Sequence, residues 1–244
     1  MPQKPTISIL PAFGDNYIYL VEYTKQKCFV VDPGDARIVH KELNRLDLRL
    51  THIFATHHHA DHIGGIHPLK NETGCTVIGP DVNRISMIDT VMGDEDVFSL
   101  TGLTIRCLAT PGHTATSVCY FLSGESFQQP VLFTGDTLFV CGCGRMFECD
   151  GQRMYASLKK LAALPDETLI YPGHDYTEEN LRFALTIEPD NKELKAKLND
   201  IQEQTARNTP TVPSLFGEEK KLNPFLKASS WQAFAALRRK KDVF

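Results

Sequence analysis

The chain has 244 residues, with 26 lysine and arginine residues against 30 aspartate and glutamate residues, so its formal net charge is −4 and its pI is near 6.1. An apolar content of 42% and a charged content of 23% are typical of a globular protein, and they exclude a mainly disordered chain. The acidic balance argues against a nucleic-acid-binding protein, which needs a positive surface to neutralise phosphates.

The N-terminal segment lacks an apolar stretch of about 7–15 residues, which a secretory signal needs. No window reaches the roughly 18 uninterrupted apolar residues of a membrane-spanning helix. Seven cysteines are an odd number spread over a long chain, which indicates reduced thiols rather than a disulfide framework. We therefore expect a cytoplasmic protein that binds neither membrane nor nucleic acid, and we expect a monomer.

The first two thirds of the sequence alternate strand-like and helix-like patterns. Residues 7–10, 17–23 and 28–31 predict an antiparallel opening, and apolar residues at helical spacing predict a helix over residues 36–46. Later strand-like runs lie at residues 52–55, 76–78, 103–109, 118–122, 131–134 and 168–171, with a helix at about residues 153–164. Many short strands with few helices predict an α/β or α+β domain in which helices cover sheets.

The strand-like pattern ends near residue 175. Beyond it, apolar residues recur at helical spacing around Leu181, Leu194 and Phe234, with a loop between residues 208 and 213. We therefore expect a larger domain over residues 1–175 and a smaller helical domain over residues 176–244.

A dense group of metal-ligand residues follows the strand predicted at residues 52–55. It contains His57, His59, Asp61 and His62. In an extended backbone, residues two positions apart point the same way, so His57 and His59 converge while His58 points away. A lone histidine is more often structural, but four such side chains within six residues predict a divalent metal site.

Three later strand-like runs each end in a glycine turn followed by one ligand-type residue. These residues are His113, Asp136 and His174. In layered α/β proteins, binding groups gather at the carboxyl ends of strands, so four strand ends could bring all of these side chains to one rim. Asp32, which also follows a strand, could support a ligand from behind or simply form a turn.

The predicted ligands are too numerous for one zinc ion, which takes three or four, and they suit two metals. We assign His57, His59 and His113 to one metal, Asp61, His62 and His174 to the other, and Asp136 to both as a bridge. A metal-bridging hydroxide would be the nucleophile, with Asp61 and Asp136 as the catalytic side chains. Zinc is the expected metal, and iron or manganese are alternatives because imidazole and carboxylate suit all three.

The ligand pattern resembles the metallo-β-lactamase superfamily, and other motifs resemble its glyoxalase II (hydroxyacylglutathione hydrolase) family. These motifs are Pro11-Ala12-Phe13-x-Asp15-Asn16-Tyr17, Val31-Asp32-Pro33-Gly34, Gly135-Asp136-Thr137-Leu138-Phe139, Gly142-Cys143-Gly144-Arg145, Gly173-His174-x-Tyr176-Thr177 and Leu237-Arg238-Arg239-x-Lys241-Asp242-x-Phe244. The metal motif points only to the superfamily, whereas the central and C-terminal motifs are specific to the family. Together they span nearly the whole chain.

This resemblance implies a four-layered αββα metal domain followed by a helical domain that binds glutathione. It also implies hydrolysis of S-(2-hydroxyacyl)glutathione, such as S-D-lactoylglutathione, to glutathione and a 2-hydroxy acid such as D-lactate, the second step of methylglyoxal detoxification. The family's glutathione contacts fall on Arg145, Phe147, Tyr176, Arg238 and Lys241. Many members have tyrosine in place of Phe147 and glutamate in place of Asp175, so a hydroxyl contact is missing at the first position.

Thioester hydrolysis fits these residues, because the thiolate leaving group has a parent pKa of about 8.5 and departs without a strong general acid. Three other functions stay open. One is another hydrolase on this scaffold, acting on a lactone, lactam or phosphodiester. The second is a mononuclear-iron persulfide dioxygenase, which would leave Asp61 outside the metal shell. The third is a non-catalytic metal-binding module. Spacing alone also allows Arg238 and Lys241 to be a solvated basic helix end.

Overall fold

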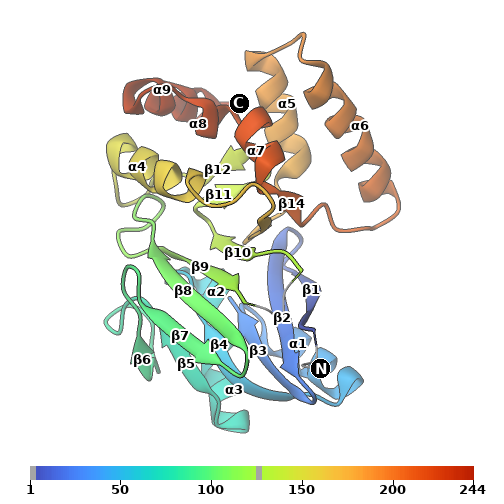
Figure 1. The fold of residues 1–244 in the computed structure, drawn as a ribbon, viewed down its shortest axis with the longest axis vertical. Coiled ribbons are helices and arrows are strands. Elements are labelled where there is room, and N and C mark those ends of the chain that lie inside the picture. Colours follow the sequence, from blue (N-terminus) through green and yellow to red (C-terminus); the bar gives the residue numbers. More distant parts are fainter. Residues whose placement is uncertain (1–3, 125–127) are drawn as a thin grey trace.

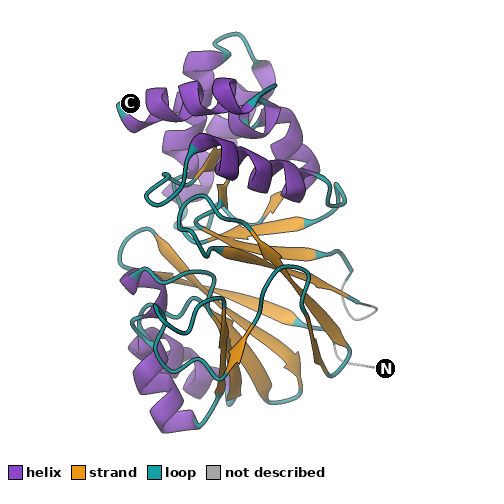
Figure 2. Cartoon of the chain, turned by 90° about the vertical axis from the view of Figure 1, so that its left-hand side faces the viewer, coloured by secondary structure: helices purple, strands orange, loops and turns teal. Residues whose placement is uncertain are grey.

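Two sheets packed face to face form the centre of the molecule, and helices cover the outer face of each. The computed structural model describes residues 4–124 and 128–244. In Figure 2 the layers follow one another as helix, sheet, sheet, helix. The four-layered αββα arrangement expected from the sequence is therefore confirmed.

The first sheet has six strands in the order β1-β2-β3-β4-β5-β6. Strands β1 to β3 are antiparallel, as predicted, and β4 to β6 run parallel to β3. Helices α1, α2 and α3 belong to the crossovers that this parallel order requires. The bounds are β1 Thr6–Ala12, β2 Asn16–Thr24, β3 Lys27–Val31, α1 Ala36–Leu46, β4 Arg49–Phe54, α2 Ala60–Ile63, α3 Ile66–Thr73, β5 Thr76–Gly79 and β6 Thr90–Val91.

The second sheet also has six strands, in the order β14-β13-β10-β9-β8-β7. Strands β7 to β10 form an antiparallel meander, β13 is parallel to β10, and β14 is antiparallel to β13. Because β8 and β10 flank β9 and both oppose it, their carboxyl ends lie at the same edge. The bounds are β7 Val97–Leu100, β8 Leu103–Ala109, β9 Val118–Ser123, β10 Val131–Gly135, β13 Leu169–Pro172 and β14 Ser214–Leu215, with a small ribbon of β11 Leu138–Phe139 and β12 Gly142–Cys143.

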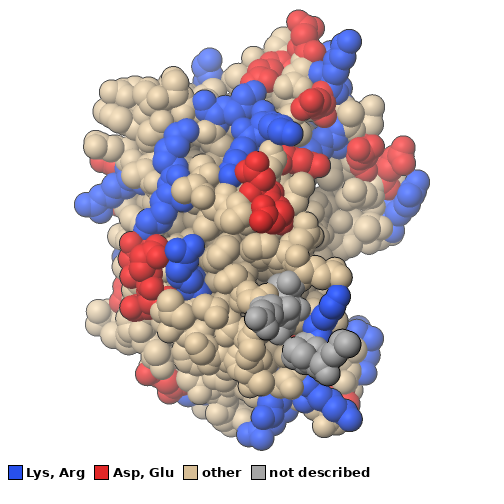
Figure 3. Space-filling model, in the orientation of Figure 1, with Lys and Arg blue, Asp and Glu red and all other residues tan. Residues whose placement is uncertain are grey.

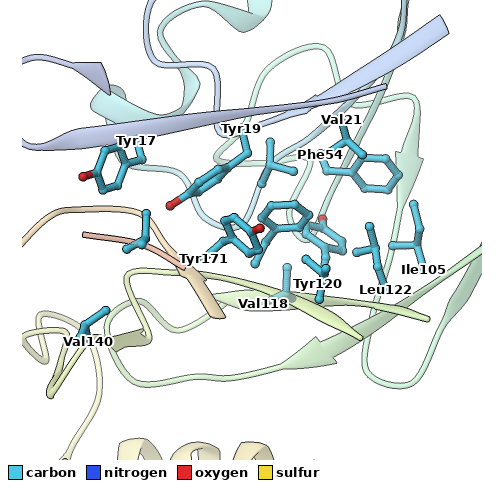
Figure 4. Close-up of a cluster of buried hydrophobic side chains, with 14 of the residues drawn as sticks. Tyr17, Tyr19, Val21, Phe54, Ile105, Val118, Tyr120, Leu122, Val140 and Tyr171 are labelled. Carbon is cyan, nitrogen blue, oxygen red and sulfur yellow. The ribbon is translucent and has the colours of Figure 1, made fainter. Parts of the chain in front are cut away.

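Buried aromatic side chains fill the space between the sheets (Figure 4). Tyr19 on β2 points across this space, and its ring centroid lies 5.2 Å from the rings of Phe133 on β10 and Tyr171 on β13. Its hydroxyl donates a hydrogen bond to the carbonyl oxygen of Pro172, at 2.5 Å. The first sheet is thus joined directly to the end of β13, which leads into His174.

Helices cover the outer face of the second sheet (Figure 1). They are α4 Gly151–Ala162, α5 Thr177–Ile187, α7 Phe216–Leu222, α8 Pro224–Lys227 and α9 Trp231–Asp242, while α6 Lys192–Ala206 packs against α5. The sequence prediction lacked several short elements, among them α3, β7, the ribbon of β11 and β12, and α7. It also lacked two contacts of the C-terminal region: β14 adds a strand to the sheet, and α9 packs against α4. A strand of two residues is too short to show an alternating pattern. The boundary at residues 175 and 176 stays a prediction.

All seven cysteines are free thiols, and six of them are buried. Burial raises the pKa of Cys28, Cys107 and Cys119 to about 12, so these thiols stay protonated and inert near neutral pH. This agrees with the expectation of reduced thiols. Across residues 4–124 and 128–244, no helix combines the length and the apolar character needed to span a membrane.

The position of α9 depends on Phe234, which is fully buried against Tyr155 of α4 and Phe225 of α8. We expect Phe234→Ala to lower the free energy of unfolding by about 3–5 kcal/mol, because it leaves a cavity between these helices. Denaturant titration followed by circular dichroism measures the change. Trp231→Ala on the same helix is the control, and it should cost less because Trp231 is 41% exposed. Equal losses in the two variants would contradict this packing.

Candidate metal centre

The side chains predicted as metal ligands come from the carboxyl ends of four strands and meet at one rim. His57, His59, Asp61 and His62 follow β4, while His113, Asp136 and His174 follow β8, β10 and β13. His58 belongs to none of the groups of possible ligands, and its Nε2 lies 3.3 Å from Nη1 of Arg84, although its ring centroid is 5.1 Å from that of His59. The two-layered fold therefore concentrates the ligand-type residues of distant segments in one place.

A first group consists of His57, His59, His113 and Asp136, whose ligand atoms all lie within 4.8 Å of one another. His59 Nδ1 is 3.0 Å from His113 Nε2. The same His113 nitrogen is 3.3 Å from Oδ2 of Asp136. The three histidines are the residues assigned to the first metal, and Asp136 is the residue assigned as the bridge.

A second group consists of Asp61, His62 and His174, again with ligand atoms within 4.8 Å of one another. The two histidines face each other through their Nε2 atoms, which are 3.2 Å apart. Oδ2 of Asp61 lies 3.4 Å from each of these nitrogens. Asp61 is therefore turned into the group, whereas a mononuclear centre was expected to leave it outside.

Asp136 contacts both groups and is buried. Its Oδ2 lies 3.3 Å from the Nε2 atoms of His113 and His174 and 3.9 Å from that of His57. Its Oδ1 lies 3.4 Å from Nε2 of His62. One carboxylate thus stands between two sets of imidazole nitrogens, which is the position that a bridging ligand requires.

Two observations test whether this donor set fits metal ions. His57 Nε2 and Asp136 Oδ1 are buried and have no hydrogen-bond partner, although buried polar atoms normally have one. In addition, two nitrogens bound tetrahedrally to one zinc ion would be about 3.4 Å apart, since each Zn–N bond is about 2.1 Å. The observed separations of 3.0 and 3.2 Å are close to this value. The residues present fit a pair of divalent ions.

Asp32 holds His62 from behind. Its Oδ2 accepts a hydrogen bond from Nδ1 of His62 at 3.0 Å and another from the hydroxyl of Thr56 at 2.6 Å. Its Oδ1 accepts from the backbone N–H of Thr56 at 2.7 Å. Because Nδ1 is engaged with this carboxylate, Nε2 of His62 faces the centre, where it could bind a metal ion. Asp32 therefore supports His62, and it also forms the turn that the sequence allowed, since its carbonyl oxygen accepts a hydrogen bond from the backbone N–H of Gly34 at 2.9 Å.

Other histidines of the centre are oriented in the same way. His113 donates from Nδ1 to the carbonyl oxygen of Arg145 at 2.8 Å, and Nδ1 of His174 lies 3.1 Å from Oδ1 of Asp15. Asn16 donates to Oδ2 of Asp61 at 2.8 Å. In the sequence, Asp15 and Asn16 stood out only as part of the opening motif, because nothing in their spacing relates them to His174, 159 positions from Asp15, or to Asp61, 45 positions from Asn16.

The close packing of these groups shifts their pKa values. Hydrogen bonds from His174 and His62 hold the pKa of Asp61 well below its usual range. Burial alone would lower the pKa of His174, yet its hydrogen bonds with Asp136 and Asp61 raise it to about 10. Burial holds the pKa of His57 well below its usual value, so His57 is neutral and can act as a ligand. The centre therefore combines ionised carboxylates with nitrogen donors.

A cavity of about 460 Å³ opens beside the centre. Its lining includes all of the residues predicted to contact glutathione: Arg145, Phe147, Tyr176, Arg238 and Lys241. Phe147 is 64% exposed at the mouth, and the Tyr176 ring stacks on His174 with centroids 5.0 Å apart. Arg238 and Lys241 are buried and paired with acids, so they are not a solvated helix end.

The comparisons with known proteins agree over the whole chain. The family model described as "Metallo-beta-lactamase superfamily" matches residues 12–174, and that described as "Hydroxyacylglutathione hydrolase C-terminus" matches residues 175–244. A hydroxyacylglutathione hydrolase from Pseudomonas putida is 43% identical over 98% of this chain and 99% of its own. Another, from Chromohalobacter salexigens, is 45% identical over 91% of this chain and 86% of its own. The solved structure of ETHE1 from Myxococcus xanthus superposes with a TM-score of 0.72 at 30% identity, covering 96% of this chain and 90% of that one.

An αββα fold with two groups of histidine and aspartate at its strand ends defines the metallo-β-lactamase superfamily, and the match over residues 12–174 agrees with it. The C-terminal match and the full-length similarity are more specific. This chain belongs to the hydroxyacylglutathione hydrolase family, also called glyoxalase II. The resemblance that the sequence motifs predicted is confirmed.

The support that Asp32 gives to His62 leads to a prediction. We expect Asp32→Asn to weaken metal binding about 10- to 100-fold, the range typical for residues that orient a ligand. An amide is uncharged and has one acceptor oxygen, so it cannot accept all three hydrogen bonds as the carboxylate does. Competition with a chromophoric chelator measures the affinity.

Asp35→Asn is the matched control. Asp35 is the N-cap of α1 and pairs with Arg37 on the surface, so this substitution should leave metal affinity unchanged. The role assigned to Asp32 is wrong if the two variants bind metal equally well.

Proposed function

We propose that this chain hydrolyses S-(2-hydroxyacyl)glutathione thioesters, such as S-D-lactoylglutathione, to glutathione and a 2-hydroxy acid. Membership of the hydroxyacylglutathione hydrolase family makes it a thioester hydrolase. The observation that carries the proposal is the single cavity in which both ligand groups and the predicted cationic contacts meet. The reaction is the second step of methylglyoxal detoxification.

The centre described above would hold two divalent ions. When bound, such ions act as Lewis acids and lower the pKa of a water molecule that attacks the carbonyl carbon. The chain's own contribution is to fix the positions of these ions through His57, His59 and His113 on one side and Asp61, His62 and His174 on the other. Asp136 joins the two sides and Asp61 orients the attacking water. Zinc is the metal that we propose for both positions, because imidazole and carboxylate form its usual ligand set.

The cavity also suits the rest of the substrate. Glutathione thioesters carry two carboxylates and one ammonium group, and guanidinium and ammonium side chains pair well with carboxylates. Arg145 approaches from the loop after β12, while Arg238 and Lys241 come from α9, so the ligand would lie between the metal region and the helices. We propose that residues 1–175 form the metal domain and that the helical domain, residues 176–244, supplies Tyr176 and the two cations of α9.

Phe147 defines the approach to the metal centre. Its ring centroid lies 5.8 Å from that of His59 and 5.2 Å from that of His113, in edge-to-face arrangements. Without a hydroxyl group, Phe147 offers the substrate only an apolar surface beside the ligands. We propose that it packs against the thioester region and excludes water from one side of it. The free thiols further support a proposal that the enzyme works in the cytoplasm, and we propose that it does so as a monomer.

A hydrolysis assay on metal-quantified protein tests this function. We expect rapid cleavage of S-D-lactoylglutathione and far slower turnover of an acylated homoserine lactone, a β-lactam and a phosphodiester, because only the first carries the two carboxylates and the ammonium group of glutathione. Removal of metal with a chelator should abolish turnover, and added zinc should restore it. Full activity of metal-free protein, or a preference for the lactone, would contradict the proposal.

The bridging position of Asp136 gives a second test. Loss of a residue that only supports a ligand costs about 10–100-fold. Asp136→Ala should reduce kcat/KM by more than this, because both groups lose a ligand. Absorbance assays of thioester cleavage measure kcat/KM, and metal analysis measures the metal content of the variant. Asp150→Asn serves as the control, since Asp150 caps α4 and lies outside the cavity lining. An Asp136→Ala variant with normal metal content and normal turnover would refute the assignment.

Arg145 offers the cleanest test of substrate binding, because its side chain is 61% exposed and its Nε lies 3.6 Å from Oδ1 of Asp242. Arg145→Gln should raise KM about 3- to 10-fold, since a charge-assisted hydrogen bond from this exposed side chain contributes about 0.7–1.4 kcal/mol to binding. Steady-state kinetics measure the change. Arg153→Gln, an exposed arginine on α4, should leave KM unaltered. The assignment of Arg145 fails if the two variants behave alike.

A further inference from the structure

Each cation of the cavity already has an acidic partner within the chain. Arg145 and Arg238 both contact Asp242, with distances of 3.6 and 3.1 Å. Lys241 is paired with Glu179, which comes from α5 on the opposite wall. Figure 3 shows basic and acidic side chains intermixed over the C-terminal helices on the face drawn there. A carboxylate that enters this cavity therefore meets three cations that share two acidic partners, of which Glu179 is paired with Lys241.

The ammonium group of Lys241 is enclosed on its other sides. Its side chain is 5% exposed, and Nζ lies 5.8 Å from the ring centroid of Phe183 and 5.1 Å from that of Phe244. Within the part of the chain that the structure describes, Glu179 is the only acid in an ion pair with it. A buried ammonium group needs such a partner, because burying a charge without compensation is costly.

The two acids differ in how firmly they are held. Asp242 follows Arg238 by four positions on the same helix and accepts hydrogen bonds from its guanidinium group, so it is part of the local structure of α9. Glu179 is 61% exposed, lies in the first turn of α5, and has Lys241 as its ion-pair partner. Its carboxylate can rotate into water without leaving a buried charge of its own.

We propose that Glu179 is an affinity-determining residue that occupies Lys241 in the free enzyme and is displaced by a carboxylate of the glutathione part of the substrate. The inference rests on the proposed function and adds a residue to it. Substrate binding then exchanges one carboxylate for another at Lys241, so only the difference between the two pairs contributes to affinity. Free glutathione keeps both carboxylates, so Glu179 weakens the binding of substrate and product alike.

The test compares Glu179→Gln with Glu178→Gln. Both remove one negative charge from the first turn of α5, but Glu178 pairs with Arg182 outside the cavity. We expect Glu179→Gln to bind S-methylglutathione, a thioether that cannot be hydrolysed, about three- to fivefold more tightly than wild type, or about 0.7–1 kcal/mol. Isothermal titration calorimetry measures this binding, and the KM for S-D-lactoylglutathione should fall by a similar factor. Glu178→Gln should leave both quantities unchanged.

A double-mutant cycle shows whether Glu179 acts through Lys241. In a Lys241→Gln background, Glu179→Gln should no longer raise the affinity for S-methylglutathione, whereas a general effect of charge would persist. Unchanged or weaker binding by the single Glu179→Gln variant would overturn the inference, and so would an equal gain from Glu178→Gln. Because the calorimetric result does not depend on turnover, wild-type protein that binds the thioether without cleaving the thioester would refute the proposed function alone.

Discussion

The carboxylate of Asp136 is the group on which the centre depends, because it is buried between two sets of imidazole nitrogens and contacts both. Two carboxylates and five imidazole rings are packed here so closely that hydrogen bonds between them raise the pKa of His174. Even so, His57 Nε2 and Asp136 Oδ1 are left buried without a partner. A pair of divalent ions would replace the shared protons and would give these atoms a partner, which agrees with the family assignment.

The fold serves this constraint by bringing strand ends together. Strands β4, β8, β10 and β13 come from two sheets, and each places its ligands just beyond its last residue. Contacts between the sheets then fix the relative positions of those ends. Tyr19 reaches from β2 to the carbonyl oxygen of Pro172, and the backbone N–H of Tyr17 donates to the carbonyl oxygen of Gly173 at 2.8 Å. His174 therefore has little freedom to leave the centre.

The substrate side of the cavity follows a different principle. There each cation has an acidic partner before any ligand arrives: Asp242 is shared by the two arginines, and Glu179 is paired with Lys241. The strength of these pairs sets the free energy that a substrate carboxylate must exceed. Specificity in this region depends on competition between internal and incoming acids as much as on the presence of cations.

The sequence by itself determined the layered class, the first three strands, helix α1 with its bounds and the histidine and aspartate side chains that gather at one rim, because periodicity and strand-end motifs are local signals. Only the tertiary structure decided that Asp32 and Asn16 support the ligands, that β14 joins the second sheet and that Glu179 faces Lys241. The reason is physical. These contacts join residues far apart in the chain through side chains whose types are common on any surface, so no spacing in the sequence distinguishes them until packing brings them together.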